Sequence, residues 1–315
     1  MSEFKDISKC IEEKAAANYC DEDLNSKLNS KLSNKLSSDL SNNYCPTKVI
    51  DSHCHIYPDA IAVRAAKSVG DFYGISMCKD GSVASLLKSG ANVAQTGISN
   101  YIVHSVALRK GNVTSINDFI ASAASSEPKF IGFATMHQDF TEVETEVQRA
   151  IALGLKGFKL HPDSQAVNAD DPRLMQLYEI IEGRLPLILH CGDYRYDYSH
   201  PRRIKRILKA FPKLVLNAAH FGGWSIYDLA LEYLEEENCY MDVSSASVYL
   251  GPRRTTELIN IYGAERILFG SDFPMWDPAI EYQRFLKNEL SEAAREMILW
   301  QNAERFVAGM LPNKS

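Results

Sequence analysis

The sequence contains no apolar run near the roughly 20 residues that a membrane-spanning helix needs, and its first residues include no apolar signal region. The formal net charge is -6 at pH 7, so the strongly basic surface typical of nucleic-acid-binding proteins is missing. Seven cysteines occur without any Cys-x-x-Cys pair, which favours free thiols in a cytoplasmic protein. We therefore expect a cytoplasmic protein without nucleic-acid or membrane partners. Its oligomeric state, a homo-oligomer included, stays open.

Residues 1–45 differ in composition from the rest of the chain. Leucine recurs there at every fourth position, as Leu24, Leu28, Leu32, Leu36 and Leu40. Each four-residue step turns about 40° beyond one full helical turn, so these leucines do not form a straight apolar seam. The intervening Asn and Ser residues are weak helix formers. We expect a disordered or marginally helical, low-complexity extension over residues 1–45 and one folded domain over residues 46–315.

Short apolar runs alternate with helix signals from Asp51 onward, and eight of these runs are predicted strands. The runs are Val49–Tyr57, Asn100–Ala107, Lys129–His137, Gly157–His161, Leu185–Cys191, Lys213–Phe221, Cys239–Ser245 and Arg266–Phe273. Most of them are apolar throughout, as expected for strands buried on both faces of a parallel sheet. Eight strands with helices between them predict an α/β fold, a (β/α)8 TIM-like barrel.

Several of the predicted helices carry start signals. Asp171 and Pro172 combine a capping carboxylate with a proline in the first turn. Thr141 and Glu144 have the spacing of a capping box. The stretch between residues 57 and 100 is longer than one crossover helix requires, so we expect it to hold an extra helix or a lid over the barrel.

Side chains that bind metals stand at the ends of four of the predicted strands. They are His53 and His55 on the first strand, His190 on the fifth, His220 on the sixth and Asp272 on the eighth. Successive strand residues alternate between faces, so His53 and His55 point to the same side. Imidazole and carboxylate together suit zinc, iron, nickel or manganese. Because barrel strands present their carboxyl ends at one face, the pattern predicts a metal site there.

This ordered set, within residues 48–312, resembles the amidohydrolase superfamily, and most closely the amidohydrolase-related branch that includes aminocarboxymuconate semialdehyde decarboxylase. The resemblance implies that His53, His55, His190 and Asp272 bind one divalent metal, often zinc. It also implies that Asp272 and His220 are catalytic, or that His220 takes a second metal. A bound divalent metal lowers the pKa of its water from 15.7 to about 7, which supplies a nucleophile for hydrolysis.

Lys159 and His161 share one face of the fourth predicted strand. Other branches of the superfamily place a carboxylated lysine at this position, so Lys159 and His220 would hold a second metal in that case. Lys159 is otherwise a cation for an anionic substrate or a partner of a nearby carboxylate. We favour the unmodified, substrate-binding cation, because buried lysines shift their pKa readily. For His161, contact with substrate and a place on the barrel rim are both open.

The loop between residues 193 and 201 carries Arg195 among tyrosines. Loops at this end of a barrel determine specificity, so Arg195 is a candidate for binding an anionic or aromatic substrate, with packing on the rim as the alternative. His104 and His137 end the second and third predicted strands and are interpreted as rim residues.

The family resemblance implies an enzyme that acts on a small molecule. We expect a metal-dependent hydrolase that directs a metal-activated water at an amide, ester or lactone. The alternative is a non-oxidative decarboxylase of a small aromatic or muconate-type acid on the same metal site. A third reading is a binding protein built on an inert barrel, and the presence of every expected ligand residue counts against it. Fold alone does not decide between these functions.

Overall fold

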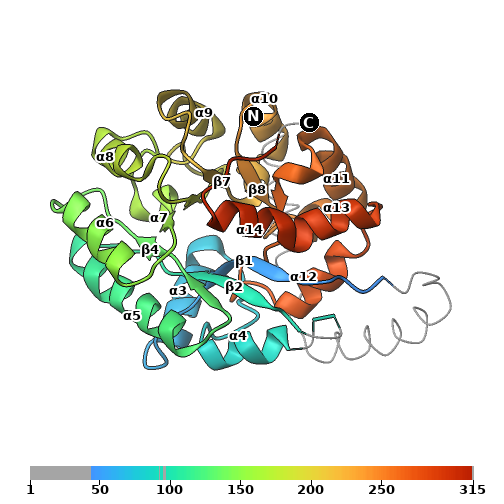
Figure 1. Cartoon of the computed structure of the whole chain (residues 1–315), viewed down its shortest axis with the longest axis horizontal. Coiled ribbons are helices and arrows are strands. Elements are labelled where there is room, and N and C mark those ends of the chain that lie inside the picture. Colours follow the sequence, from blue (N-terminus) through green and yellow to red (C-terminus); the bar gives the residue numbers. More distant parts are fainter. Residues whose placement is uncertain (1–43, 92, 95–96, 314–315) are drawn as a thin grey trace.

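The computed structural model describes residues 44–91, 93–94 and 97–313. Nearly all of the predicted extension, residues 1–45, lies outside this set. Within it, helices surround a central group of strands (Figure 1). No helix in the described part of the chain is long and apolar enough to cross a membrane.

Nine parallel strand segments within the described residues form the eight strands of a barrel. They are β1 (Ile50–His55), β2 (Asn100–His104), β3 (Phe130–Gly132), β4 (Ala134–Thr135), β5 (Phe158–Leu160), β6 (Leu187–Leu189), β7 (Leu216–Ala218), β8 (Tyr240–Asp242) and β9 (Ile267–Leu268). The segments pair in two sheets, β1-β2-β3 and β4-β5-β6-β7-β8-β9. β3 and β4 are consecutive parts of the third barrel strand, interrupted only at Phe133.

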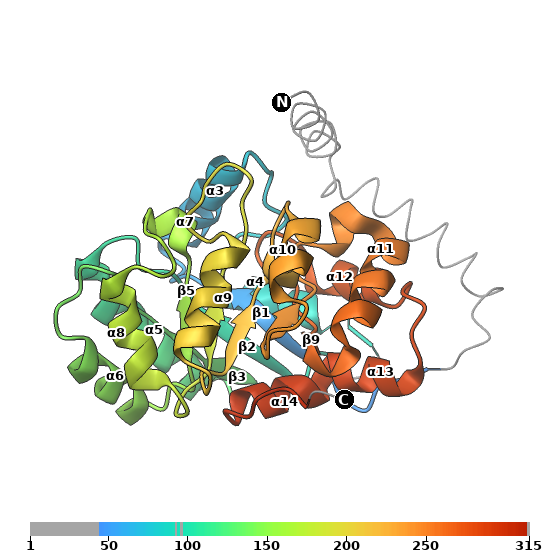
Figure 2. The same ribbon diagram turned by 90° about the horizontal axis from the view of Figure 1, so that it is seen from above.

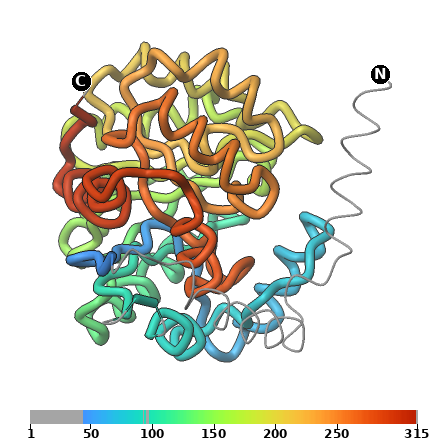
Figure 3. Tube along the Cα trace, turned by 90° about the vertical axis from the view of Figure 1, so that its right-hand side faces the viewer, coloured from blue at the N-terminus to red at the C-terminus, as the bar shows by residue number. Residues whose placement is uncertain are grey.

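The last strand closes onto the first. The backbone N–H of Ser52 donates to Phe269 O at 2.9 Å, and that of His55 donates to Phe273 O at 2.7 Å. Cys54 and Phe273 form a parallel bridge between the same two segments. The first strand lies beside the C-terminal part of the chain in Figure 3 as well. These contacts complete the (β/α)8 barrel that the sequence predicts.

The helices of the described residues follow the strands in turn. The α-helices are α3 (Ala62–Tyr73), α4 (Val83–Gly90), α5 (Val113–Ser126), α6 (Val143–Ala152), α7 (Pro162–Gln165), α8 (Pro172–Ile181), α9 (Pro201–Ala210), α10 (Tyr227–Leu234), α11 (Ser247–Tyr262), α12 (Pro278–Phe285), α13 (Glu292–Glu296) and α14 (Asn302–Val307). Short 3-10 turns occur at η1 (Lys110–Asn112), η2 (His220–Gly222) and η3 (Ala264–Arg266), and a π-helical turn at η4 (Met297–Gln301).

The start signals at Asp171–Pro172 and at Thr141 have different outcomes in the structure, while Pro201 and Pro278 also begin helices. α8 begins as expected, because the Asp171 side chain accepts from Arg173 N and Pro172 occupies the first turn. The predicted capping box at Thr141 and Glu144 is wrong. α6 begins at Val143 with Glu142 as the N-cap, and no side chain caps it.

An apolar core fills the end of the barrel opposite the predicted site. Ile102, Ile188 and Leu268 pack there with Phe133 and with Phe306 of α14. Figure 2 shows α14 at this end and α3 with α7 at the other. Burial of such side chains stabilises the barrel by roughly 1.5–3 kcal/mol each, and it leaves the opposite end free for polar groups.

The predicted extra segment between the first two strands is confirmed. α3 and α4 both lie in this stretch, where one crossover helix would suffice. α3 packs its apolar side chains towards the barrel opening, and its last residue, Tyr73, contacts His161 at the N-terminus of α7. The segment thus forms one wall over the carboxyl ends of the strands.

The cysteine side chains of the described residues are separate from the predicted site residues. Cys54 and Cys191 adjoin two of the candidate histidines in sequence, but they are fully buried free thiols that face the outer core. Cys45 and Cys239 are also free. Cys78 is disulfide-bonded, so the expectation of free thiols throughout is wrong at this position.

Candidate metal centre and substrate cavity

His53 and His55 meet Asp272 at the point where β1 and β9 adjoin. Their Nε2 atoms lie 3.5 and 3.6 Å from Asp272 Oδ1. His53 is fully buried, and the His55 side chain is only 14% exposed. The structure therefore brings together three of the four predicted metal ligands. The strand alternation accounts for this, because Cys54 between the two histidines points to the other face.

The backbone at Asp272 holds its carboxylate in place. Asp272 has a left-handed conformation with φ of 59°, which costs a non-glycine residue roughly 1–2 kcal/mol. Its N–H donates to His53 O at 2.9 Å. The Ser245 hydroxyl donates to Asp272 Oδ2 and accepts from Trp276 Nε1. The strained turn is thus fixed from both sides, and Oδ1 is left facing the histidines.

His190 and His220 face each other across the neighbouring strand ends. His190 Nδ1 lies 3.1 Å from His220 Nε2. The Ser244 carbonyl lies 2.9 Å from His220 Nδ1 and accepts its proton, so His220 Nε2 carries a lone pair. His190 Nε2 points at Asp163 Oδ2, 3.6 Å away. When His190 Nε2 carries the ring proton, His190 Nδ1 has a lone pair that faces the lone pair of His220 Nε2. A bound cation stabilises two lone pairs that converge in this way.

Lys159 and Asp242 flank His53. Asp242 Oδ2 lies 3.0 Å from His53 Nδ1, and Lys159 Nζ lies 2.9 Å from His53 Nε2. The carboxylate therefore accepts from Nδ1, which leaves Nε2 as the acceptor. Burial lowers the pKa of Lys159 to about 8, although Asp272 and Asp242 raise it. The predicted substrate-binding role of Lys159 stays a prediction.

His161 joins the cluster from the start of α7. Its Nδ1 accepts from Ser164 N at 3.2 Å, and its Nε2 lies 2.6 Å from the Tyr73 hydroxyl. Its ring stacks on that of His190, with centroids 3.8 Å apart and planes 9° apart. Both nitrogens already have partners, so His161 is suited to hold the His190 ring and the α3 wall. Its predicted contact with substrate stays a prediction.

Arg195 lies beside the site but is strongly paired. Its guanidinium donates to both carboxylate oxygens of Asp193 and to Phe72 O at 2.6 Å. It also lies over the rings of Phe72 and Tyr73, 4.8 and 5.3 Å from their centroids. Arg195 is not among the residues that line the cavity described below. Its predicted role in binding substrate stays a prediction.

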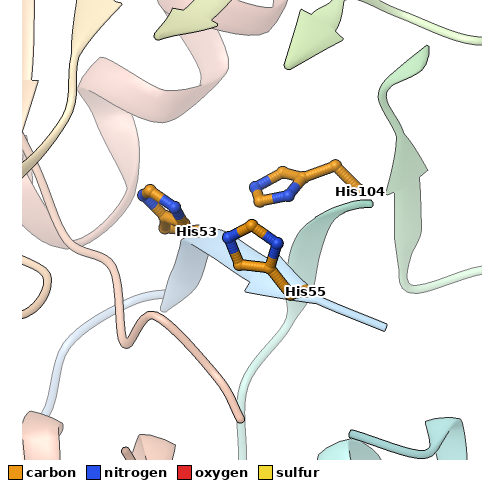
Figure 4. A group of neighbouring side chains, drawn as sticks. All are labelled: His53, His55 and His104. Atoms are coloured by element: carbon orange, nitrogen blue, oxygen red, sulfur yellow. The ribbon is translucent and has the colours of Figure 1, made fainter. Parts of the chain in front are cut away.

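The interpretation of His104 as a rim residue is wrong. His104 is fully buried, and its ring packs edge-on against His55 and His53, with centroids 4.4 and 5.1 Å apart. Figure 4 shows the three imidazoles gathered between β1 and β2. His137 is also buried, at 7% exposed, and its Nδ1 accepts from Asp139 N. From the sequence alone, a single histidine after a strand does not reveal whether it is buried beside other histidines or lies on the rim.

Sequence analysis also did not find the carboxylates behind the histidines. Potential ligand atoms lie within 4.8 Å of one another in three groups of described residues: His53 with His55 and His104, His53 with His220 and Asp242, and His161 with Asp163 and His190. Burial raises the pKa of Asp163 to about 7, and the Ser199 hydroxyl donates to it. Aspartates are frequent after strands, so their positions alone did not single out these two.

A cavity of about 620 Å³ opens above these side chains. His55, His190, His220 and Asp272 line its buried floor. Its walls are mainly apolar and aromatic and come from α3, α5 and the β9 loop: Ile61, Ala65, Val69, Phe72, Tyr73, Met77, Ile116, Phe119, Pro274 and Met275. Such a volume, with an apolar lining and a few convergent polar groups, suits a small organic molecule.

A protein-family model for amidohydrolases matches residues 50–308. The chain belongs to the amidohydrolase family. This family assignment agrees with the resemblance drawn from the histidine and aspartate pattern.

Individual relatives are more distant. A 2-amino-3-carboxymuconate-6-semialdehyde decarboxylase of Dictyostelium discoideum is 24% identical over 242 residues, which cover 63% of this chain and 67% of that protein. An uncharacterised TIM-barrel protein of Bordetella bronchiseptica matches with a TM-score of 0.64 and 22% identity, covering 83% of this chain and 99% of that one. A dihydroxybenzoic acid decarboxylase of Polaromonas sp. JS666, with bound manganese and 2-nitroresorcinol, has a TM-score of 0.63 and 18% identity, covering 83% and 97%. These structures show that the fold is shared.

The side chains of this family member fit a divalent metal. Imidazole nitrogens and a carboxylate oxygen are the usual ligands of zinc and manganese in proteins. Both nitrogens of His104 are buried and have no hydrogen-bond partner among the described residues. Burial lowers the pKa of His53, His55 and His190 well below the ordinary value. The rings are therefore neutral, which is the form that binds metals.

Proposed function

We propose that this protein is a metal-dependent decarboxylase that removes carbon dioxide, without oxidation, from a small aromatic or similarly unsaturated carboxylic acid. The observation that carries the proposal is the cavity, in which apolar and aromatic walls stand over a floor of His55, His190, His220 and Asp272. The decarboxylase names of the Dictyostelium and Polaromonas relatives support it. They favour this alternative over the hydrolase that the sequence analysis put first.

The reaction has a simple balance. The bond between the carboxylate carbon and its neighbour breaks, carbon dioxide leaves, and the electron pair remains on the neighbouring carbon. One proton then adds to that carbon, so no oxidant or reductant takes part. The protein must hold the carboxylic acid, keep water away from the electron-rich carbon and deliver one proton to it.

The metal would be held by His53, His55, His190 and Asp272, as the sequence pattern implies. When bound, a divalent cation offsets the negative charge of the substrate and of the electron pair left behind. The sequence analysis expected zinc, whereas the Polaromonas relative carries manganese. Both metals accept this set of nitrogen and oxygen ligands.

His220 and Asp272 are the proposed proton carriers, because both border the cavity floor. Ser244 fixes the His220 ring through Nδ1, so only Nε2 is free to exchange a proton near substrate. Ser245 fixes Asp272 through Oδ2. Each group is therefore held in one orientation, which general acid catalysis requires.

The apolar walls suit the flat hydrocarbon part of the substrate. Phe72 of α3 and Phe119 of α5 both line the cavity, as do Ile116 and Met275. Aromatic side chains of this kind pack against a ring or a conjugated chain and exclude water from it.

The test measures product from a panel of acids labelled with ¹³C in the carboxylate. Protein loaded with zinc or with manganese is mixed with dihydroxybenzoic acids and with aminocarboxymuconate semialdehyde, and ¹³CO2 is followed by mass spectrometry. A parallel panel holds amides, esters and lactones of similar size. We expect ¹³CO2 release that stops on chelation and little hydrolysis. Hydrolysis of an amide, ester or lactone without release of ¹³CO2 from any labelled acid would favour the metal-dependent hydrolase instead.

A further inference from the structure

His104 is the one residue of the candidate centre to which nothing above gives a role. It ends β2, where it pairs in register with His55 of β1. Adjacent strands lie about 4.8 Å apart, and the two rings stand on the same side of the sheet with their centroids 4.4 Å apart. Figure 4 shows the His104 ring reaching over β1 towards His53 and His55.

The burial of His104 is not balanced by hydrogen bonds. The residue is 0% exposed, and neither Nδ1 nor Nε2 has a partner among the described residues. A buried polar group left unpaired costs roughly 1–3 kcal/mol, and the imidazole carries two. Buried polar atoms without partners indicate a ligand, an ion or an ordered water.

The surroundings of His104 indicate which of these it is. Potential ligand atoms of His53, His55 and His104 all lie within 4.8 Å of one another. Asp242 accepts from His53 Nδ1, so the lone pair of His53 is on Nε2, and a metal bound there would replace the contact of Nε2 with Lys159 Nζ at 2.9 Å. Three neutral imidazoles that converge from two adjacent strands form a typical ligand set for zinc or manganese.

We propose that His104 is a further ligand of the divalent metal, bound together with His53 and His55. His104 would then join His53, His55, His190 and Asp272 in holding the metal. This inference rests on the metal dependence in the proposed function but not on decarboxylation. It adds a ligand from the second strand, a position that the sequence pattern did not include.

The test replaces His104 with Phe, which keeps a planar ring and removes both nitrogens. Metal affinity is measured by competition with a chelating dye, without any substrate, and the visible spectrum of the Co²⁺-loaded protein reports the ligand set. We expect His104→Phe to weaken metal binding more than the 10–100-fold that loss of an outer partner costs, and to change the Co²⁺ spectrum. The matched control is His137→Phe, at the end of the third strand, where Nδ1 already has a backbone partner. This control should leave both measurements unchanged.

The outcomes separate the possible failures. Unchanged affinity and spectrum in a His104→Phe variant that is also more stable than wild type would identify His104 as a core residue and overturn the proposal. Absence of metal binding in the wild type would instead overturn the metal-dependent function itself. Should His104→Phe not fold, ¹⁵N-histidine NMR of the wild type with Zn²⁺ decides the matter, because a coordinated His104 nitrogen shifts strongly and a free one does not.

Discussion

Three of the candidate histidines have a specific group behind the ring. Asp242 accepts from His53 Nδ1, and the Ser244 carbonyl accepts from His220 Nδ1. Asp163 stands behind His190. Such partners set the tautomer and the ring orientation of metal-binding histidines, and they strengthen the ligand. The three groups explain why several nitrogens are turned towards one centre.

We predict that Asp163→Asn weakens metal binding by about 10–100-fold, on the scale of outer-partner losses. The amide would donate towards His190 Nε2, so the ring proton would move to Nδ1 and occupy the nitrogen that faces His220. Chelator competition gives the dissociation constant. Asp170→Asn is the control, because the ion pairs of Asp170 among the described residues are with Arg203 and Arg206 and not with a histidine. Equal affinity in both variants would show that Asp163 does not orient His190.

For His220 we predict a separation between metal content and turnover. If a single metal is bound without His220, His220→Asn keeps the metal and lowers turnover by roughly 10²–10⁴-fold, the usual contribution of a general acid or base. If His220 and a carboxylated Lys159 hold a second ion, the same change lowers the count from about two metals per chain to about one. Elemental analysis beside the ¹³CO2 assay distinguishes the two, and we expect the first result.

Arg109 is the only Arg or Lys among the described residues that line the cavity. It has no carboxylate within ion-pair distance among the described residues, unlike Arg195 with Asp193. We predict that Arg109→Met raises KM for an anionic substrate about tenfold and changes kcat little, because an exposed guanidinium contributes to binding more than to chemistry. Lys110→Met, a neighbouring cation outside the lining, is the control. An unchanged KM in steady-state kinetics would refute a role in attraction of the acid.

Not every residue of the centre was predictable from the chain alone. The positions of His53, His55, His190, His220 and Asp272 relative to predicted strands brought them into one expected site, and the structure places them together at the barrel opening. His104 was missed, since one histidine at a strand end is as often a surface residue. Its importance depends on being opposite His55 in register, which is a property of pairing between strands.

At the scale of elements, the loops after the strands touch each other closely. Gly192, after β6, has φ of 76°, and a Cβ there would lie 2.5 Å from the Cα of Gly223, after β7. The loops that follow His190 and His220 therefore pass backbone against backbone. Only glycine at this position allows both the conformation and the contact.

We predict that Gly192→Ala lowers the free energy of unfolding by about 2–5 kcal/mol. The left-handed conformation costs an alanine about 1–2 kcal/mol, and the forced shift of neighbouring backbone adds about 1–3 kcal/mol. Gly154→Ala is the matched control, since Gly154 has φ of 84° but nothing within 4 Å of the added Cβ. Urea denaturation measures both. If Gly192→Ala lowers the free energy of unfolding no more than Gly154→Ala does, the two loops can move apart at little cost.

The strands and most helix positions followed from local sequence, because apolar runs and proline starts act within a few residues. The false capping box at Thr141 shows the limit of that approach. The spacing was right, yet the chain turns so that Glu142 precedes the helix and makes no capping bond. A four-residue pattern does not contain the tertiary contacts that can override such a local signal.

At the scale of the whole molecule, the ordered N-terminal segment is attached to the C-terminal helices. The Tyr44 hydroxyl donates to Glu296 Oε1 at 2.9 Å, and the Arg295 guanidinium lies 5.4 Å from the Tyr44 ring centroid. Thr47 N donates to the same carboxylate. These contacts join the chain preceding β1 to helices that cover the last strand.

We predict that removal of residues 1–43 leaves metal content and turnover unchanged, because every candidate ligand lies in the barrel. Removal of residues 1–46 should keep metal and turnover but lower stability by about 1–3 kcal/mol, since the Tyr44 bond to a charged group is lost. Calorimetry and elemental analysis of both truncations measure this. Loss of metal in the shorter truncation would assign the N-terminal residues a part in the site.

The barrel itself was predictable because eight apolar runs at regular intervals permit few other arrangements. The cavity was not. Its walls come from the insertion after the first strand and from α5, and their shape depends on side chains that meet only in the folded molecule. Substrate identity belongs to this unpredicted part of the structure.

The closure of the barrel by its two terminal strands also determines when the centre exists during synthesis. His53 and His55 leave the ribosome early, whereas Asp272 and the β9 segment that anchors Ser52 and His55 emerge near the end. A nascent chain therefore carries histidines with no carboxylate to complete the set. A metal site that includes Asp272 would be complete only after translation of the final strand, and a product of premature termination before β9 would lack that ligand, however much of its sequence is intact.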